Sequence, residues 1–233
     1  MIDALKSNKK VDAKKIVLVG HSEGGLIAPM VASERDDVAA IVMLAGPTVD
    51  GEKVVLNQTR KIQTESGIDK SAIDAQAKMM KTFFAEIKSG NEITDSTINT
   101  AYMVFSESVP KQIRDEVGSE EDFKRQVKTL NSPWFKYFLT YDPLPALQKT
   151  KCPILFLIGD KDTQVDAALH VPLAEKTFNV SGNKKNKIVR FPKLNHLFQE
   201  CETGLPDEYI KISQTFAPKA LKEISDWINA ATK

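Results

Sequence analysis

The stretch that decides the fold is "IVLVGHSEGG", residues 16–25. Its aliphatic run, residues 16–19, ends on a glycine, and a serine follows two positions later with two more glycines behind it. A continuous apolar run of this length is typical of a strand that is covered on both faces, as in a parallel sheet. Small apolar residues continue beyond residue 25 and favour a helix over residues 22–33. The stretch therefore predicts a buried strand, a sharp turn and a helix.

Gly-x-Ser-x-Gly between a strand and a helix is the pattern of a nucleophile elbow. The serine, Ser22, occupies a strained turn, and we expect Gly20 and Gly24 to provide the room that the turn needs. Its hydroxyl would stand clear of the sheet at a helix N-terminus, where the backbone N–H of Glu23 points to a developing oxyanion. The stretch thus indicates Ser22 as a nucleophile and Glu23 as an oxyanion donor.

The rest of the chain predicts an α/β fold with a parallel sheet of about four strands and a helical insertion. Residues 1–47 form the first part of the core and end with a strand at 39–44. Residues 48–147 lose the strand signal and show helical periodicity, which predicts a helical cap. Residues 148–233 restore the core, with strands at 153–158 and 187–191 and helices at 167–178 and 218–230.

A serine nucleophile needs a base and an orienting acid, and the chain has three histidines. His21 adjoins the serine and cannot turn onto its hydroxyl, whereas His170 lies in a predicted helix as a surface or packing residue. His196 follows the last strand in a loop and is the candidate base. Asp162 is the candidate acid and Asp160, nearer the strand end, the second choice. The order serine, acid, base is that expected of an α/β-hydrolase.

The stretches "KKIVLVGHSEGG", "SPWFKYFLTYDP", "CPILFLIGDKDTQV" and "FPKLNHLF" resemble the α/β-hydrolase superfamily. They are similar to its capped bacterial serine hydrolases, which are often grouped with esterases and serine-aminopeptidase-like proteins. The resemblance covers essentially the whole chain. It implies Ser22 as nucleophile, Asp162 as acid and His196 as base, and it implies that the helices of residues 48–147 cover the pocket.

The resemblance also implies a sheet of eight strands with the nucleophile after the fifth, whereas here the nucleophile strand is the first one visible. We therefore expect residues 16–19 to form an exposed apolar edge, which favours pairing with another chain. Three explanations stay open: a fragment of a longer gene, which we favour, a domain completed by a partner copy in a homodimer, or a short protein. In all three cases the visible sequence does not identify a second N–H donor to the oxyanion.

The composition argues against several classes of partner. With 32 basic and 31 acidic residues the net charge is +1, which favours neither nucleic acid nor an acidic membrane surface. Only two cysteines occur, Cys152 and Cys201, and we expect neither a disulfide framework nor a thiol nucleophile. No apolar run is long enough to span a bilayer, no metal-ligand spacing is present, and no cofactor is implied. Without a signal peptide in view, a cytoplasmic location is slightly favoured.

These observations predict a serine hydrolase that cleaves small-molecule carboxylic esters through an acyl-enzyme intermediate. A peptidase or an acyltransferase with the same three residues is the alternative within this chemistry. An inactive truncated fragment, or an interaction module that pairs through its edge strand, is the alternative outside it. Nothing in the sequence identifies the acyl or the alcohol side of a substrate.

Overall fold

The computed structural model describes residues 1–109, 120–181 and 183–233. The chain divides into two compact units, which are described separately: Met1–Val49 with Asp142–Lys233, and Asp50–Tyr141. We call the first the sheet unit and the second the helical unit. The helical unit ends earlier than the predicted bound of residue 147, because the helix Leu144–Lys149 packs against helices of the sheet unit.

The sheet unit contains one parallel sheet of four strands in the order β1-β2-β3-β4, as predicted. The strands are β1 (Val17–His21), β2 (Ala40–Leu44), β3 (Ile154–Gly159) and β4 (Lys187–Phe191). In register, His21 pairs with Leu44, and Gly159 pairs with Phe191. Because all four strands run in the same direction, the loops that follow them meet at one edge of the sheet, its carboxyl edge.

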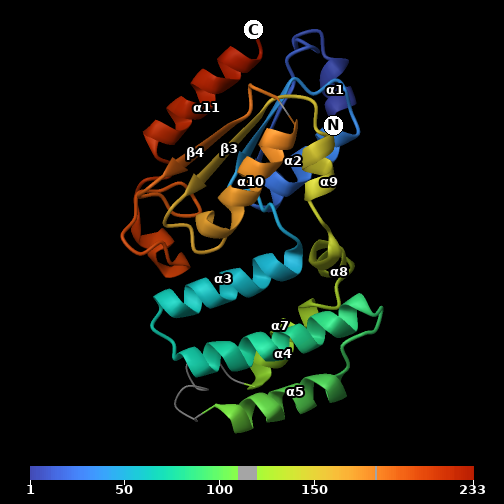
Figure 1. Ribbon diagram of the computed structural model, residues 1–233, viewed down its shortest axis with the longest axis vertical. Helices are drawn as coiled ribbons and strands as arrows, with labels where there is room; N and C mark the ends of the chain where they lie inside the picture. The colour runs from blue at the N-terminus through green and yellow to red at the C-terminus, as the bar shows by residue number, and fades with distance from the viewer. Residues whose placement is uncertain (110–119, 182) are drawn as a thin grey trace. The chain divides into compact units, whose positions relative to one another are not determined.

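Helices cover the sheet on both faces. The sheet unit contains α1 (Ile2–Lys6), α2 (Glu23–Ser33), α9 (Leu144–Lys149), α10 (Ala167–Ser181), the 3-10 helix η1 (Pro206–Lys211) and α11 (Pro218–Ala231). Helix α9 packs against both α2 and α10, so these three form one layer, and Figure 1 shows α11 on the other side of the strands. The crossovers through α2 and α10 both join parallel strands, and right-handed crossovers place their helices on the same face.

The core of the sheet unit explains why β2 and β3 read as unbroken apolar runs. Every residue of both strands is buried, including Ile41 and Phe156, which are fully inaccessible. Strands at the centre of a sheet that is covered on both faces have no solvent side, so they need no polar alternation. Trp227 of α11 belongs to the same cluster, which confirms that the amphipathic C-terminal helix packs its apolar face against the core.

The helical unit has its own core. It contains α3 (Gly51–Glu65), α4 (Lys70–Lys88), α5 (Asp95–Ser108), α7 (Glu120–Thr129) and α8 (Pro133–Thr140). Side-chain oxygens of Asp50, Asp69 and Thr94 accept backbone N–H bonds at the first turns of α3, α4 and α5, which fixes where each helix begins. The apolar stripe of α4 is buried in a separate cluster that includes Phe83 and Phe84.

Strand β1 lies at the edge of the sheet and, among the described residues, pairs only with β2. Its burial is much lower than that of β2: Val19 is 53% exposed, whereas all of β2 is buried. Ile27 on α2 is also exposed, at 46%. Of the predicted edge residues 16–19, Ile16 is buried, Val17 and Leu18 are half-buried, and only Val19 is exposed, so the apolar edge is smaller than expected.

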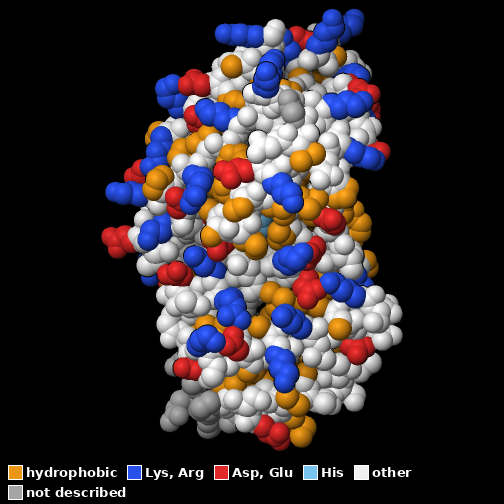
Figure 2. All heavy atoms as spheres, viewed as in Figure 1, with side chains coloured by type: hydrophobic (Ala, Val, Ile, Leu, Met, Phe, Trp, Pro, Cys, Tyr) orange, Lys and Arg blue, Asp and Glu red, His pale blue; other side chains and the backbone are white. Residues whose placement is uncertain are grey.

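Charges of both signs are mixed over the face shown in Figure 2, in agreement with the balanced composition. Many ion pairs of the described residues join two exposed side chains, such as Lys151 with Asp36 at 2.8 Å. Such pairs contribute little to stability. In the part of the chain that the structure describes, no helix combines the length and the apolar character that crossing a membrane requires.

The turn after β1 needs a residue without a side chain at two positions. Only one of them, Gly20, is among the two glycines that the sequence indicated. A Cβ on Gly20 would lie 1.9 Å from the carbonyl oxygen of Gly24, and one on Gly25 would lie 2.7 Å from Cα of Gly46. A Cβ on Gly24 would meet nothing within 4 Å. The expectation for Gly20 is therefore confirmed, whereas the second glycine with a steric reason is Gly25 instead of Gly24.

This difference predicts opposite effects for two neighbouring substitutions. Gly20→Ala should lower the free energy of unfolding by about 3 kcal/mol or more, because its methyl group meets backbone that cannot move aside. Gly24→Ala should change it by less than about 1 kcal/mol, in the direction of higher stability, because alanine favours the helix. Urea denaturation of both variants measures the difference, and equal losses of stability would contradict the steric account.

Candidate active site

Ser22 lies in a strained turn between β1 and α2. Its backbone has φ 54° and ψ −118°, a conformation that residues other than glycine rarely adopt. Its N–H donates to the carbonyl of Leu44 at 2.8 Å, so the turn is held to the end of β2, and Gly25 N–H donates to Ser22 O at 2.9 Å where the helix starts. Strain of this kind costs of order 1–3 kcal/mol and is concentrated at functional sites. Glu23 is the first residue of α2, so its N–H belongs to the positive end of the helix dipole.

Asp162 follows β3 and is completely buried. One carboxylate oxygen, Oδ1, accepts the N–H groups of Gln164 and Val165, both at 2.8 Å. The other oxygen, Oδ2, lies 2.8 Å from Nδ1 of His196. The two backbone bonds fix the plane of the carboxyl group, so its second oxygen has one orientation toward the imidazole.

His196 lies in the loop after β4, residues 194–200, which we call the His196 loop. A bridge between Leu194 and Glu200 closes this loop, and the fully buried Asn195 accepts N–H bonds from residues 197 and 199. The imidazole is 4% exposed. Because a carboxylate only accepts, His196 carries its proton on Nδ1, and Nε2 is left as the basic nitrogen. This is the tautomer that a general base for a hydroxyl requires.

The structure thus brings Asp162 and His196 together and places Ser22 at the same edge of the sheet. His21, the residue before the serine, donates from Nε2 to the backbone carbonyl of His196 at 2.8 Å. The residues of the Ser22 turn and the His196 loop are therefore in contact. Among the described residues no hydrogen bond joins the Ser22 hydroxyl to His196; such bonds are often long before substrate binds.

Asp160, the alternative acid, and the two cysteines do not share the hydrogen bond that joins Asp162 to His196. Asp160, the second choice for the acid, pairs with Arg190 through a bond of 2.8 Å at the surface. Burial raises the pKa of the Cys152 thiol to about 11, and desolvation also raises that of Cys201 to about 11. At neutral pH both are therefore thiols and not the thiolates that act as nucleophiles.

His170 is a buried residue of α10. Its Nδ1 accepts the backbone N–H of Thr48 at 3.0 Å, and the Thr48 hydroxyl donates to the His170 carbonyl at 3.1 Å. Its Nε2 has no hydrogen-bond partner among the described residues. Burial lowers the pKa of His170 to about 4, and the carboxylates of Asp162 and Asp166 oppose this shift only partly. His170 is therefore neutral at physiological pH and holds the segment that leaves β2.

The lowered pKa of His170 predicts a pH-dependent loss of stability. Between the unfolded value of 6.5 and the folded value of about 4, the unfolded chain binds a proton that the native protein does not. Stability therefore falls as the pH drops through this range, by a total of about 3 kcal/mol. His170→Gln has no titrating group, so its urea midpoint should depend less on pH between 7 and 4. Parallel curves for the two proteins would contradict the prediction.

Two features of the His196 loop had no separate signal in the sequence. Phe198 is fully buried with φ 58°, in a region that a bulky side chain rarely adopts, and its ring stacks on Phe216 at 5.2 Å. Asn195 ties the loop to itself. Only the position of these residues on either side of His196 could have indicated their importance, because the partner of Phe198 lies outside the loop and the bonds of Asn195 depend on how the loop folds.

The parallel four-stranded sheet with helices on both faces is the fold of an α/β-hydrolase. The chain belongs to the BAAT / acyl-CoA thioester hydrolase C-terminal family, whose model matches residues 1–201. The predicted resemblance to the α/β-hydrolase superfamily is thereby confirmed.

Solved structures with a similar fold share little sequence with this chain. An esterase from Pyrococcus furiosus is 14% identical over 100% of this chain and 59% of its own, with a TM-score of 0.49. An acetyl xylan esterase from Paenibacillus sp. R4 is 15% identical over 98% of this chain and 49% of its own, with a TM-score of 0.48. The chain therefore spans 59% or less of the length of these two proteins. No curated protein matches it.

Proposed function

We propose that this chain hydrolyses carboxylic esters of small molecules, with Ser22 as nucleophile, His196 as general base and Asp162 as the acid that orients the base. The observation that carries this proposal is the buried 2.8 Å hydrogen bond between Asp162 and Nδ1 of His196. It leaves the basic Nε2 of the imidazole on a loop that contacts the Ser22 turn. An isolated surface histidine would have neither the fixed tautomer nor a neighbouring serine in a strained turn.

The reaction takes place in two steps. His196 Nε2 accepts the hydroxyl proton of Ser22 while the serine oxygen adds to the ester carbonyl. The N–H of Glu23 at the start of α2 donates to the oxyanion. The imidazolium then protonates the leaving alcohol, and an acyl-serine remains. In the second step water adds to the acyl carbonyl, with the same imidazole taking its proton, and release of the carboxylic acid restores Ser22.

Acyl thioesters are a second candidate substrate class, supported by the family to which the chain belongs. The steps are the same, except that a thiolate leaves instead of an alcohol. A thiolate is the better leaving group, so formation of the acyl-serine depends less on proton donation by His196. The buried Asp162–His196 pair supports both classes, because His196 takes the proton of Ser22 and later that of water whichever group leaves.

A panel of matched substrates tests the proposal. Short-chain p-nitrophenyl esters report the release of p-nitrophenol, and acyl-CoA thioesters of the same chain lengths report a free thiol. We expect turnover of at least one series, and labelling by a fluorophosphonate that competes with it. If the chain turns over neither series and takes up no label, the proposal is wrong. Turnover of an acyl amide but not of either ester would instead favour a peptidase.

A second proposal is that the chain associates with another copy of itself. Strand β1 pairs on one side only, and the 53% exposure of Val19 leaves apolar surface beside it. Unpaired strand edges of this kind pair readily with other strands. We infer that the chain associates with a second copy through β1. Light scattering across a concentration series should show a dimer, and a monomer at all concentrations would contradict this inference.

A further inference from the structure

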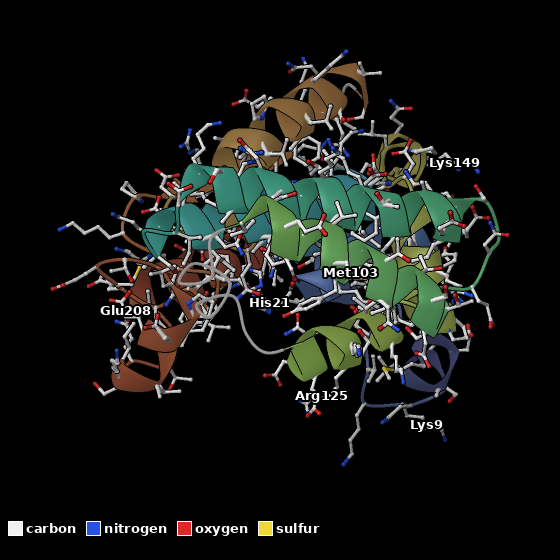
Figure 3. All side chains as sticks on the ribbon, turned by 90° about the horizontal axis from the view of Figure 1, so that it is seen from below. Lys9, His21, Met103, Arg125, Lys149 and Glu208 are labelled. Atoms are coloured by element: carbon white, nitrogen blue, oxygen red, sulfur yellow. The ribbon has the colours of Figure 1, made fainter. Side chains whose placement is uncertain are left out.

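We propose that His21 is a positioning residue, which holds the His196 loop over the Ser22 turn so that the base faces the nucleophile. This inference rests on the proposed function and assigns a role to the histidine that the sequence pattern had set aside. His21, which is labelled in Figure 3, is the last residue of β1.

Two contacts join His21 to the base. Its Nε2–H donates to the backbone carbonyl of His196 at 2.8 Å. The two imidazole rings also pack against each other, with centroids 4.6 Å apart and planes inclined by 49°. The edge of Phe198 contacts the His21 ring from the same loop, at 6.4 Å between centroids. His21 therefore contacts both the backbone and the side chains of the His196 loop.

The topology explains why the loop needs such a contact. His196 follows β4, whereas Ser22 follows β1, at the opposite end of the sheet order. With neighbouring strands about 4.8 Å apart, the loop must reach across roughly 14 Å of sheet edge. The bond to Asp162 and the bond from Lys161 N–H to the Leu194 carbonyl, at 3.1 Å, hold the loop near β3. Bonds to residues 214 and 217 hold it to the segment before α11. The contact with His21 holds it at the β1 side.

His21 is suited to this role because the segment that fixes its backbone also fixes the nucleophile. His21 pairs with Leu44 in the sheet, and the next N–H, that of Ser22, donates to the carbonyl of the same leucine at 2.8 Å. The backbone that carries the His21 ring is therefore held by the same strand end as the backbone of Ser22. One short segment of backbone thus sets the positions of both the hydroxyl and the loop that carries the base.

The same bond excludes Nε2 of His21 as the base. A carbonyl oxygen only accepts, so Nε2 of His21 must carry a proton and has no lone pair for the serine proton. Desolvation is the main cause that lowers the pKa of His21; the bond to the His196 carbonyl opposes this shift, and the charge of the His196 side chain adds to it. A neutral His21 does not oppose the positive charge that His196 acquires during the reaction.

Two substitutions separate the hydrogen bond from the packing. His21→Phe keeps a ring of similar size but removes the donor, whereas His21→Gln keeps an N–H donor at a similar reach. We expect His21→Phe to lower kcat by about 10- to 100-fold with KM within about threefold of wild type, because the base is held less well for attack. His21→Gln should recover most of the loss. Equal kcat for wild type and His21→Phe would overturn the proposal, as would equal losses in both variants.

NMR of the histidine side chains does not require turnover, so it tests the role of His21 separately from the proposed hydrolase activity. The chain has three histidines, so imidazole ¹⁵N–¹H spectra contain few signals. In wild type we expect a sharp Nδ1–H resonance of His196 that disappears in Asp162→Asn. In His21→Phe this resonance should broaden, and in His21→Gln it should sharpen again. An unchanged resonance in His21→Phe would overturn the proposal even if wild type proves inactive, and inactivity of wild type alone would count only against the proposed function.

Discussion

Ser22→Ala is expected to lower kcat on the best ester or thioester by on the order of 10⁶-fold and to abolish labelling by a fluorophosphonate. The physical reason is that no other group in the described site can form the covalent bond. Both cysteines are thiols at neutral pH, because their pKa values lie near 11. Folding should be unaffected or slightly improved, since alanine tolerates a positive φ no worse than serine. Steady-state kinetics and gel-based labelling measure both effects.

Ser33 provides a matched control in the same segment. It is the last residue of α2, and its hydroxyl donates to the carbonyl of Met30 at 2.9 Å, away from the turn. Ser33→Ala should keep both turnover and labelling. If Ser22→Ala retains the wild-type rate while Ser33→Ala does not, or if both variants are equally active, the assignment of the nucleophile is wrong.

Asp162→Asn is expected to have the next largest effect, a loss of roughly 10⁴-fold in kcat with KM little changed. Asparagine would keep the bonds from Gln164 and Val165 through its oxygen and would place its amide group where Oδ2 now contacts His196. An amide N–H donates, so Nδ1 of the histidine would become the acceptor and Nε2 would carry the proton. The base would then have the wrong tautomer for Ser22.

Asp160→Asn is the control for this prediction, since Asp160 lies two residues away and pairs with Arg190 at the surface. We expect its kcat to stay within about threefold of wild type, because exposed ion pairs contribute little. A larger loss in Asp160→Asn than in Asp162→Asn would exchange their roles, in favour of the alternative acid that the sequence also offered.

The sheet and its flanking helices followed from local patterns. The apolar runs at 40–44 and 154–158 could be assigned to central strands because burial on both faces leaves no polar alternation. The three candidate residues lie after β1, β3 and β4, and parallel strands bring such loops to one edge.

The contacts within the site could not be predicted from local sequence patterns. The bond from His21 to His196 joins residues 175 positions apart, and no local pattern predicts which backbone carbonyl a histidine will reach. Gly24 was assigned a steric role from the Gly-x-Ser-x-Gly spacing, whereas the close approach involves Gly25 and Gly46 of two different connections. Periodicity also could not show that the helix Leu144–Lys149 packs in the sheet unit, because its apolar residues suit either core.

The measurement that tests the central claim most directly is the mass-spectrometric location of the fluorophosphonate adduct. Trypsin should release residues 16–35 as one peptide, which contains both Ser22 and Ser33. We predict that fragment ions place the adduct on Ser22, and that Asp162→Asn takes up the label far more slowly than wild type. An adduct on any other residue, or no adduct while the chain still hydrolyses acyl substrates, would contradict the account.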